Sequence, residues 1–155
     1  MDKIIPYGKH FIDEDDINAV VEVLRHKNLT QGEEVENFEQ AVADFVGAKY
    51  AVAMSSWTAG LHMSCIAIGI KEGDKVVTSP ITFVASANAA LYCNADPVFV
   101  DIDSKTINLD HQKLQNTIEQ NEETKAIIPV HFAGLSCEMR EIKEIADESN
   151  LIVIE

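Results

Sequence analysis

The sequence predicts an α/β fold in which a parallel or mostly parallel sheet has helices on both faces, preceded by a two-helix N-terminal arm. Short apolar stretches alternate with helical stretches over residues 49–155, the order produced by parallel strands and their crossover helices. These short stretches are mostly apolar, as expected of strands buried on both faces. At 155 residues and 46% hydrophobic content, the chain is large enough for one good core.

Residues 1–48 are expected to form the N-terminal arm. Asp13 is a suitable N-cap, and apolar residues recur at helical spacing over residues 17–24, so a first helix is predicted there. A second amphipathic helix is predicted over residues 35–46, with Gly47 as its stop. We expect this arm to pack on the main domain or on a second subunit.

Residues 49–155 carry the repeating strand and helix pattern. Five strands are predicted, at residues 50–54, 75–78, 98–100, 126–130 and 151–154. Four helices are predicted between them, at residues 58–70, 84–93, 110–120 and 138–149. The last strand should lie inside the sheet, yet the sequence stops at Glu155 directly after it, so we expect a fragment of a longer protein.

The composition argues against several classes of partner. Nucleic acids and anionic membranes are bound by clustered Lys and Arg, so a net charge of −14 predicts neither partner. No apolar run approaches the roughly 18 residues of a membrane span, and the N-terminus lacks a signal-peptide pattern, which predicts a cytoplasmic protein. The three cysteines and five histidines show no metal-ligand spacing, so reduced thiols and no metal site are expected.

Candidate functional residues lie directly after the predicted strands, because the carboxyl ends of parallel strands form the ligand crevice of open α/β sheets. Residues 55–61 follow the first predicted strand and open a helix. A helix N-terminus offers free backbone N–H groups and the positive end of the dipole, so this corner is a candidate phosphate site. The simpler interpretation is an N-cap, which Ser56 can supply. The corner has neither a dinucleotide-binding nor a P-loop fingerprint.

Further positions leave two interpretations open. Phe83 is either a core residue or a stacking platform for a flat ligand. His131 is either an ordinary hydrogen-bonded histidine or a general base. Asp101 and Asp103 are either capping and turn residues or a carboxylate pair that serves catalysis or a metal. The residue patterns alone favour the simpler interpretation in each case.

A set of motifs follows a fixed order along nearly the whole chain. It comprises Leu29-Thr30-Gln31-Gly32 before Val35, Phe38 and Glu39, then residues 46–53, Ser56-Trp57-Thr58-Ala59, residues 80–91, residues 96–103, and residues 129–134 with Cys137 and Met139. This ordered set resembles the N-terminal part of the DegT-type nucleotide-sugar aminotransferases, which are fold type I enzymes that use pyridoxal 5'-phosphate (PLP). No single motif is decisive, but the ordered set is specific.

The resemblance implies where the cofactor would bind. Thr58 and Ala59, with Ser56 nearby, would hold the phosphate of PLP, and Phe83 would stack on its pyridine ring. Trp57 departs from the family pattern, which has a small residue at that position, so the shape of the substrate pocket is left open.

Two parts of the family's catalytic machinery are expected beyond the end of this chain. The carboxylate that keeps the pyridine nitrogen protonated would be the first residue after Glu155, and the Schiff-base lysine would follow further on. None of the ten lysines matches that lysine, so the resemblance implies no catalytic residue here. Residues 49–155 would then be part of a cofactor-binding large domain, inactive alone but active in the parent enzyme.

The resemblance also implies the parent's reaction. An amino group, usually from glutamate, would be transferred to a keto carbon of a nucleotide-linked deoxysugar for surface polysaccharide or glycan synthesis, in a homodimer. The sequence of residues 82–88 and 130–134 most resembles that of members that aminate a UDP-linked 4-keto-6-deoxy aminosugar on the route to pseudaminic-acid-like sugars. A PLP-dependent sugar dehydratase of the same family, with histidine in place of the lysine, and a non-catalytic binding or assembly domain are the alternatives.

Overall fold

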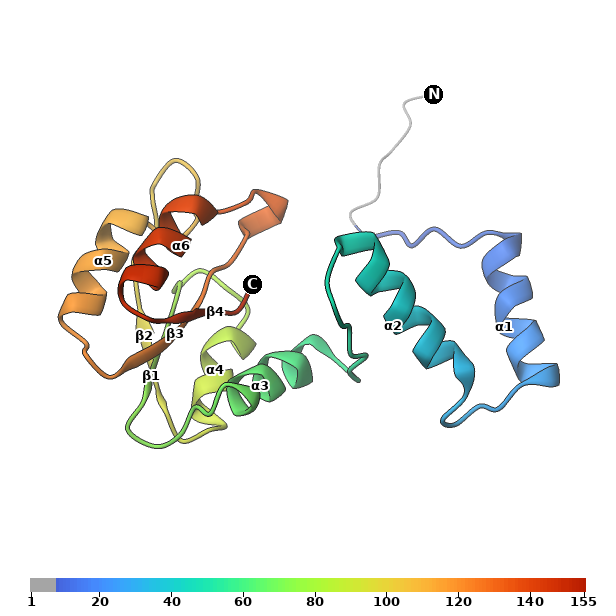
Figure 1. Ribbon diagram of the computed structural model, residues 1–155. Coiled ribbons are helices and arrows are strands. Elements are labelled where there is room, and N and C mark those ends of the chain that lie inside the picture. Colours follow the sequence, from blue (N-terminus) through green and yellow to red (C-terminus); the bar gives the residue numbers. More distant parts are fainter. Residues whose placement is uncertain (1–7) are drawn as a thin grey trace, which may run out of the picture. The chain divides into compact units, whose positions relative to one another are not determined.

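The computed structural model describes residues 8–155, so the first seven residues of the predicted arm lie outside the described residues. The chain divides into two compact units, one that ends at Ala53 and one that comprises Met54–Glu155. Figure 1 shows the elements of both units in sequence order. None of the helices among the described residues is long and apolar enough to cross a membrane.

The first unit contains the two predicted helices, α1 (Glu14–His26) and α2 (Glu33–Val46). Asp13 caps α1 as predicted: its carboxylate accepts the N–H groups of Asp15 and Asp16, and Asp16 accepts the N–H of Asp13 in return. Gly47 ends α2 in a left-handed conformation, with φ of 71°, which glycine adopts at low cost. Local capping signals therefore place both helices.

Replacing Asp13 by Ala is expected to destabilise α1 by about 1 kcal/mol, because the capping box loses its acceptor for two helix N–H groups. Amide hydrogen exchange over residues 17–26 measures the change. Asp15→Ala is the control, since Asp15 also lies in the first turn but its side chain caps nothing. Equal acceleration of exchange in both variants would show that the cap contributes nothing beyond charge at the helix N-terminus.

The second unit alternates helices and strands. In chain order its elements are α3 (Trp57–Ala67), β1 (Lys75–Thr78), α4 (Ala85–Leu91), β2 (Asp96–Phe99), α5 (His111–Glu119), β3 (Thr124–Ile128), the 3-10 turn η1 (Phe132–Gly134), α6 (Met139–Glu148) and β4 (Ile152–Val153). The four strands form one sheet in the order β2-β1-β3-β4, and every neighbouring pair is parallel. The predicted parallel α/β fold is confirmed.

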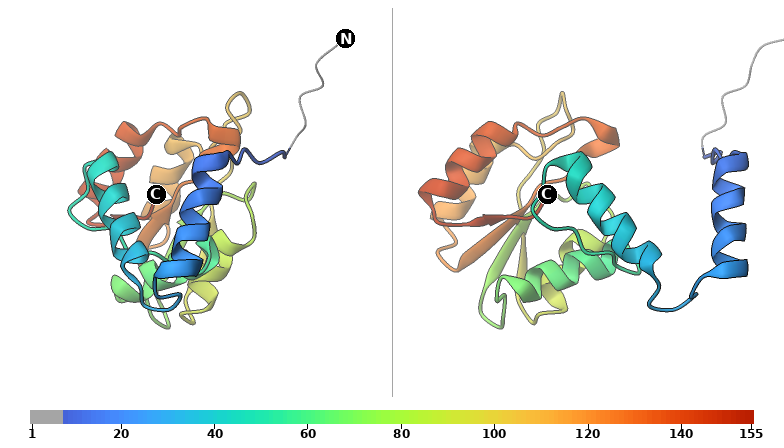
Figure 2. Two further views of the ribbon diagram at one scale, coloured as in Figure 1. Left: turned by 90° about the vertical axis from the view of Figure 1, so that its right-hand side faces the viewer. Right: turned by 45° about the vertical axis from the view of Figure 1, so that its right-hand side comes forward.

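Successive residues of each central strand face opposite sides of the sheet, so each side has its own core. Val76 packs in a cluster with residues of α3 and α4, whereas Val77 packs in a cluster with residues of α5 and α6. In β3, Ala126 and Ile128 belong to the first cluster and Ile127 to the second. Figures 1 and 2 show the sheet between these two pairs of helices. Helices on both faces are thus confirmed, and they explain why the buried positions of the central strands are apolar on both sides of the sheet.

The strand predicted at residues 50–54 is wrong. No strand ladder forms over these residues, and Tyr50 and Val52 are 73% and 69% exposed. The N–H of Ala53 donates to a carboxylate oxygen of Glu39 at 2.7 Å, where a strand would donate to a neighbouring strand. Apolar residues alone do not make a strand, because the backbone also needs a partner ladder, and the described residues supply none here.

The strand predicted at residues 98–100 begins earlier than expected, at Asp96, and includes Pro97. β2 is an edge strand of the described sheet and pairs only with β1. Proline lacks an N–H, so it is tolerated in an edge strand and not in a central one. The edge position of β2 is why the strand can include Pro97.

Two cysteines of the α3 and α4 side belong to this core. Burial raises the pKa of Cys65 to about 11, and burial also raises the pKa of Cys93. Since the thiolate is the reactive form, we expect iodoacetamide at pH 7.5 to modify the partly exposed Cys93 before Cys65, which should react only on unfolding. Mass spectrometry of timed samples tests the order. Faster modification of Cys65 would contradict it.

Candidate functional site

The second unit has a cavity of about 350 Å³ beside the carboxyl ends of β3 and β4. This is where the crevice of a parallel α/β sheet is expected. Its walls come from the start of α3, the turn before α4, the loop after β3 and the segment after β4. The lining residues are Trp57, Leu61, Thr82, Phe83, Ser86, Ile128, Pro129, Val130, His131, Ile154 and Glu155. Segments far apart in sequence thus meet at one mainly apolar site.

The first turn of α3 carries three of the predicted phosphate-binding residues. Ser56 is the N-cap, and its hydroxyl accepts the N–H of Ala59 at 3.1 Å, so this N–H is already used. The N–H groups of Trp57 and Thr58 donate to none of the described residues. Ser56, Thr58 and Ala59 do not line the cavity themselves, but Trp57, which lies between them, does. Two free amides therefore stand beside the cavity at the positive end of a helix dipole.

Phe83 is a cavity residue and not a core residue, since 72% of it is exposed. It is held in the turn before α4, where the hydroxyls of Thr82 and Ser86 lie 2.9 Å apart and the N–H of Ser86 donates to the Phe83 carbonyl. Trp57, which is 67% exposed, lines the same cavity. Two exposed aromatic rings at one cavity offer apolar faces to a flat ligand.

His131 is hydrogen-bonded through both ring nitrogens. Its Nε2 lies 2.9 Å from Oε1 of Glu155, and its Nδ1 accepts the N–H of Cys137 at 3.0 Å. A neutral histidine has one donor and one acceptor nitrogen, so Nε2 carries the proton and donates to Glu155. Neither nitrogen is then free to accept a substrate proton, which favours the simpler interpretation of His131 over a general base.

Asp101 and Asp103 do not reach this cavity and serve the local fold. The N–H of Ile102 and the ammonium of Lys113 hold the pKa of Asp101 below its usual value. Asp103 accepts the N–H groups of Lys105 and Thr106, which likewise lower its pKa. Among residues 8–155, no group of three or more His, Cys, Asp or Glu is arranged to hold a metal ion. The turn interpretation is the one that fits both residues.

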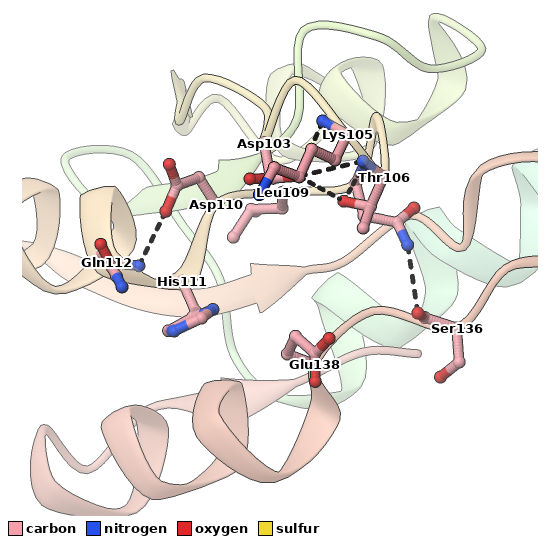
Figure 3. A pocket seen from close by; sticks show the side chains of 10 residues that line it. Asp103, Lys105, Thr106, Leu109, Asp110, His111, Gln112, Ser136 and Glu138 are labelled. Carbon is pink, nitrogen blue, oxygen red and sulfur yellow. Dashed lines mark hydrogen bonds between the residues drawn. The ribbon is translucent and has the colours of Figure 1, made fainter.

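Asp103 lines a second cavity of about 270 Å³ between the loop after β2 and the start of α6. Figure 3 shows Asp103, Lys105 and Thr106 in one turn, with Glu138 at the start of α6 below them. The carboxylates of Asp103 and Asp110 are occupied by backbone N–H groups, at 2.9–3.3 Å. The polar groups of this second cavity therefore mainly close turns and cap a helix.

Asn108 is a structural residue of the site that the residue patterns do not single out. It is 3% exposed, and its side chain bonds three backbone groups of the loop after β3, namely the carbonyls of Leu135 and Ser136 and the N–H of Phe132. Its sequence signal is an amide between two apolar residues, Ile107 and Leu109, which is unusual for an exposed loop. A buried amide of this kind is retained only where it is hydrogen-bonded.

A parallel sheet with two unpaired amides at a helix start and aromatic rings beside its crevice has the arrangement that α/β proteins use for small ligands. Residues 10–155 match the model of the DegT/DnrJ/EryC1/StrS aminotransferase family, and the chain belongs to this family.

Known relatives agree in sequence and in structure. GDP-perosamine synthase of Caulobacter vibrioides is 46% identical over 124 residues, which are 80% of this chain and 33% of that protein. The aminotransferase of Psychrobacter cryohalolentis has a TM-score of 0.88 and 35% identity, over 97% of this chain and 38% of that one. NtdA of Bacillus subtilis, solved with bound cofactor PMP (pyridoxamine 5'-phosphate), has a TM-score of 0.84 and 34% identity, over 92% of this chain and 32% of that one.

The chain spans less than two fifths of the length of the curated relatives it matches. Its fold is that of the corresponding part of the solved aminotransferases, and the family's cofactor is a pyridoxal phosphate compound, as the PMP bound to NtdA illustrates. These matches support a sugar-aminotransferase-like fold for the chain.

Proposed function

We propose that this chain is the cofactor-phosphate portion of a PLP-dependent enzyme that transfers an amino group, from glutamate, to a keto carbon of a nucleotide-linked deoxysugar. The observation that carries the proposal is the free start of α3 beside a cavity walled by an exposed Phe83, in a chain of this aminotransferase family. Support for a nucleotide-linked sugar comes from the likeness to a GDP-perosamine synthase.

The residues present fit the phosphate and ring of PLP. The N–H groups of Trp57 and Thr58, with the Thr58 hydroxyl, suit the phosphate dianion at the positive end of α3. The exposed ring of Phe83 suits the pyridine face. When bound, the cofactor supplies an electron-accepting ring and a carrier for the amino group. This chain's own residues anchor and orient it, the start of α3 at the phosphate and Phe83 at the ring.

The parent's substrate is proposed more narrowly as a UDP-linked 4-keto-6-deoxy aminosugar on the route to pseudaminic-acid-like sugars. The basis is the sequence resemblance of residues 82–88 and 130–134 to members with that substrate. In the same proposal, residues 49–155 are part of the cofactor-binding large domain of a homodimer and are inactive alone. The Schiff-base lysine and the pyridine-nitrogen carboxylate are then supplied by the rest of the parent. Three free cysteines, Cys65, Cys93 and Cys137, support a cytoplasmic location, where thiols stay reduced.

Binding of pyridoxamine 5'-phosphate tests the phosphate site. This ligand lacks the aldehyde of PLP, so it cannot form imines with the ten lysines of the chain. Trp57 is the one tryptophan in the sequence and lines the cavity, so its fluorescence should change on binding. Unphosphorylated pyridoxamine is the matched ligand control. Equal affinity for the two ligands would overturn the assignment of the start of α3 to phosphate.

Replacing Thr58 by Val is expected to weaken pyridoxamine 5'-phosphate binding about tenfold or more, because a hydrogen bond to a charged group is lost while side-chain shape is kept. The fold should be unchanged, since the Thr58 hydroxyl bonds none of the described residues. Isothermal titration gives the affinity and urea denaturation gives the stability. Unchanged affinity with a less stable helix would instead support a purely structural role.

A further inference from the structure

The loops that follow β2 and β3 are joined by one buried side chain. The amide nitrogen of Asn108 donates to the carbonyls of Leu135 and Ser136 at 2.9 and 3.1 Å. Its amide oxygen accepts the N–H of Phe132 at 2.9 Å. An asparagine side chain has two N–H donors and one carbonyl oxygen, so each of these groups is used. The loop over residues 132–136 is therefore fixed at both of its ends by Asn108.

Asn108 is itself fixed by a tightly bonded turn. The N–H of Asp103 donates to the Asn108 carbonyl at 2.9 Å, and the N–H of Ile107 donates to the Asp103 carbonyl at 2.8 Å. Ile107 has φ of 64°, a left-handed conformation that is unfavourable for a β-branched residue. Such strain persists only where the surrounding structure over-determines the backbone. The strained backbone of Ile107 thus lies directly before the buried Asn108.

The loop held by Asn108 lies between His131 and Cys137, whose contact sets the proton position on the histidine. The N–H of Cys137 donates to Nδ1 of His131, so the neutral ring must carry its proton on Nε2, which faces Glu155. The Sγ of Cys137 donates to the Val130 carbonyl at 3.2 Å and closes the loop on its inner side. His131 and Glu155 both line the larger cavity.

We propose that Asn108 is a positioning residue that holds His131 as an Nε2–H donor to Glu155 at the wall of the cavity. Through the loop, Asn108 places the Cys137 N–H against Nδ1, and this contact selects one tautomer and one ring orientation. The fixed N–H then orients the Glu155 carboxylate as a hydrogen-bond acceptor for a donor group of a bound ligand. The identity of that ligand rests on the proposed function, but the tautomer does not.

The tautomer can be read on the unliganded chain by long-range proton–nitrogen NMR at a pH where His131 is neutral, with His131→Gln to assign its signals. The wild type should show Nε2–H with Nδ1 as the acceptor. Asn108→Ala should turn this single form into a mixture of both tautomers. Asn116→Ala is the control, because the Asn116 amide bonds a carbonyl within α5 and not the loop.

Two results would overturn the proposal. The first is a wild type with the His131 proton on Nδ1. This measurement does not depend on whether any variant folds. The second is a folded Asn108→Ala chain in which His131 keeps its single tautomer. Asn108→Asp is the second variant, since it keeps an acceptor for Phe132, loses the two donors and places a carboxylate oxygen against the carbonyls of Leu135 and Ser136.

Ligand binding separates this inference from the proposed function. If the wild type shows the Nε2–H tautomer but does not bind pyridoxamine 5'-phosphate, the proposed function fails and the role of Asn108 stands. If it binds and the tautomer in Asn108→Asp is unchanged, the role of Asn108 fails and the proposed function stands. If both hold, the rearranged Glu155 carboxylate in Asn108→Asp should change the affinity several-fold relative to Asn116→Ala.

Discussion

Replacing Ile127 by Ala is expected to lower the free energy of unfolding of the second unit by about 2–5 kcal/mol. Ile127 is fully buried in β3, pairs in register with Val77, and packs in the cluster formed with α5 and α6. Removing three carbon atoms there leaves a void that the sheet cannot collapse to fill, because β1 and β4 fix β3 on both sides.

The measurement is urea denaturation followed by circular dichroism. Ile152→Ala is the matched control, since Ile152 also lies in a strand but is 45% exposed, and it should cost at most about 1 kcal/mol. Small domains are stable by only about 5–15 kcal/mol, so the Ile127 variant should lose a large part of its total stability. Similar costs for the two variants would mean that the sheet is not the centre of the core.

Replacing Phe83 by Ala is expected to reduce the affinity for pyridoxamine 5'-phosphate about tenfold, because the pyridine ring loses its aromatic face. Stability should change little, since Phe83 is mostly exposed and lies outside both core clusters. The turn that carries it is closed by Thr82 and Ser86, which the substitution leaves in place.

Isothermal titration of the variant gives the affinity, and Phe45→Ala supplies the control because Phe45 is 92% exposed on α2 and lines none of the cavities described above. Phe83→Tyr should retain most of the binding, since it keeps the ring. If Phe83→Ala and Phe45→Ala bound the ligand equally well, the stacking role of Phe83 would have to be abandoned.

The sequence was most informative where local chemistry decides the structure. The N-cap at Asp13 and the stop at Gly47 were readable because a helix end is satisfied by its own neighbours. The central strands β1 and β3 were readable because their buried residues, Val76–Thr78 and Ala126–Ile128, are mostly apolar on both faces of the sheet. The same logic failed at residues 50–54, where the apolar run is present but a partner strand is not.

The candidate site divides in the same way. Phe83 could be predicted near the ligand crevice because it follows a strand of a parallel sheet. Its exposure, which decides between a core role and a ligand-contacting role, appeared only in the structure. The bond between Ser56 and Ala59 leaves the amides of Trp57 and Thr58 as the free donors, which no residue pattern specifies. Trp57, the departure from the family pattern, proved to be a wall of the cavity.

By itself, the sequence determined the alternation of helices and strands from α3 to β4, the parallel sheet and the family, because these depend on periodicity and on motifs that are contiguous in the chain. Only the tertiary structure decided how Asn108, His131 and Glu155 form one hydrogen-bonded set. These residues are separated by 23 or more positions, and their contacts depend on the packing of loops at the ends of different strands. Hydrogen bonds between loops have no sequence period, so their partners emerge only when the sheet brings the loops together.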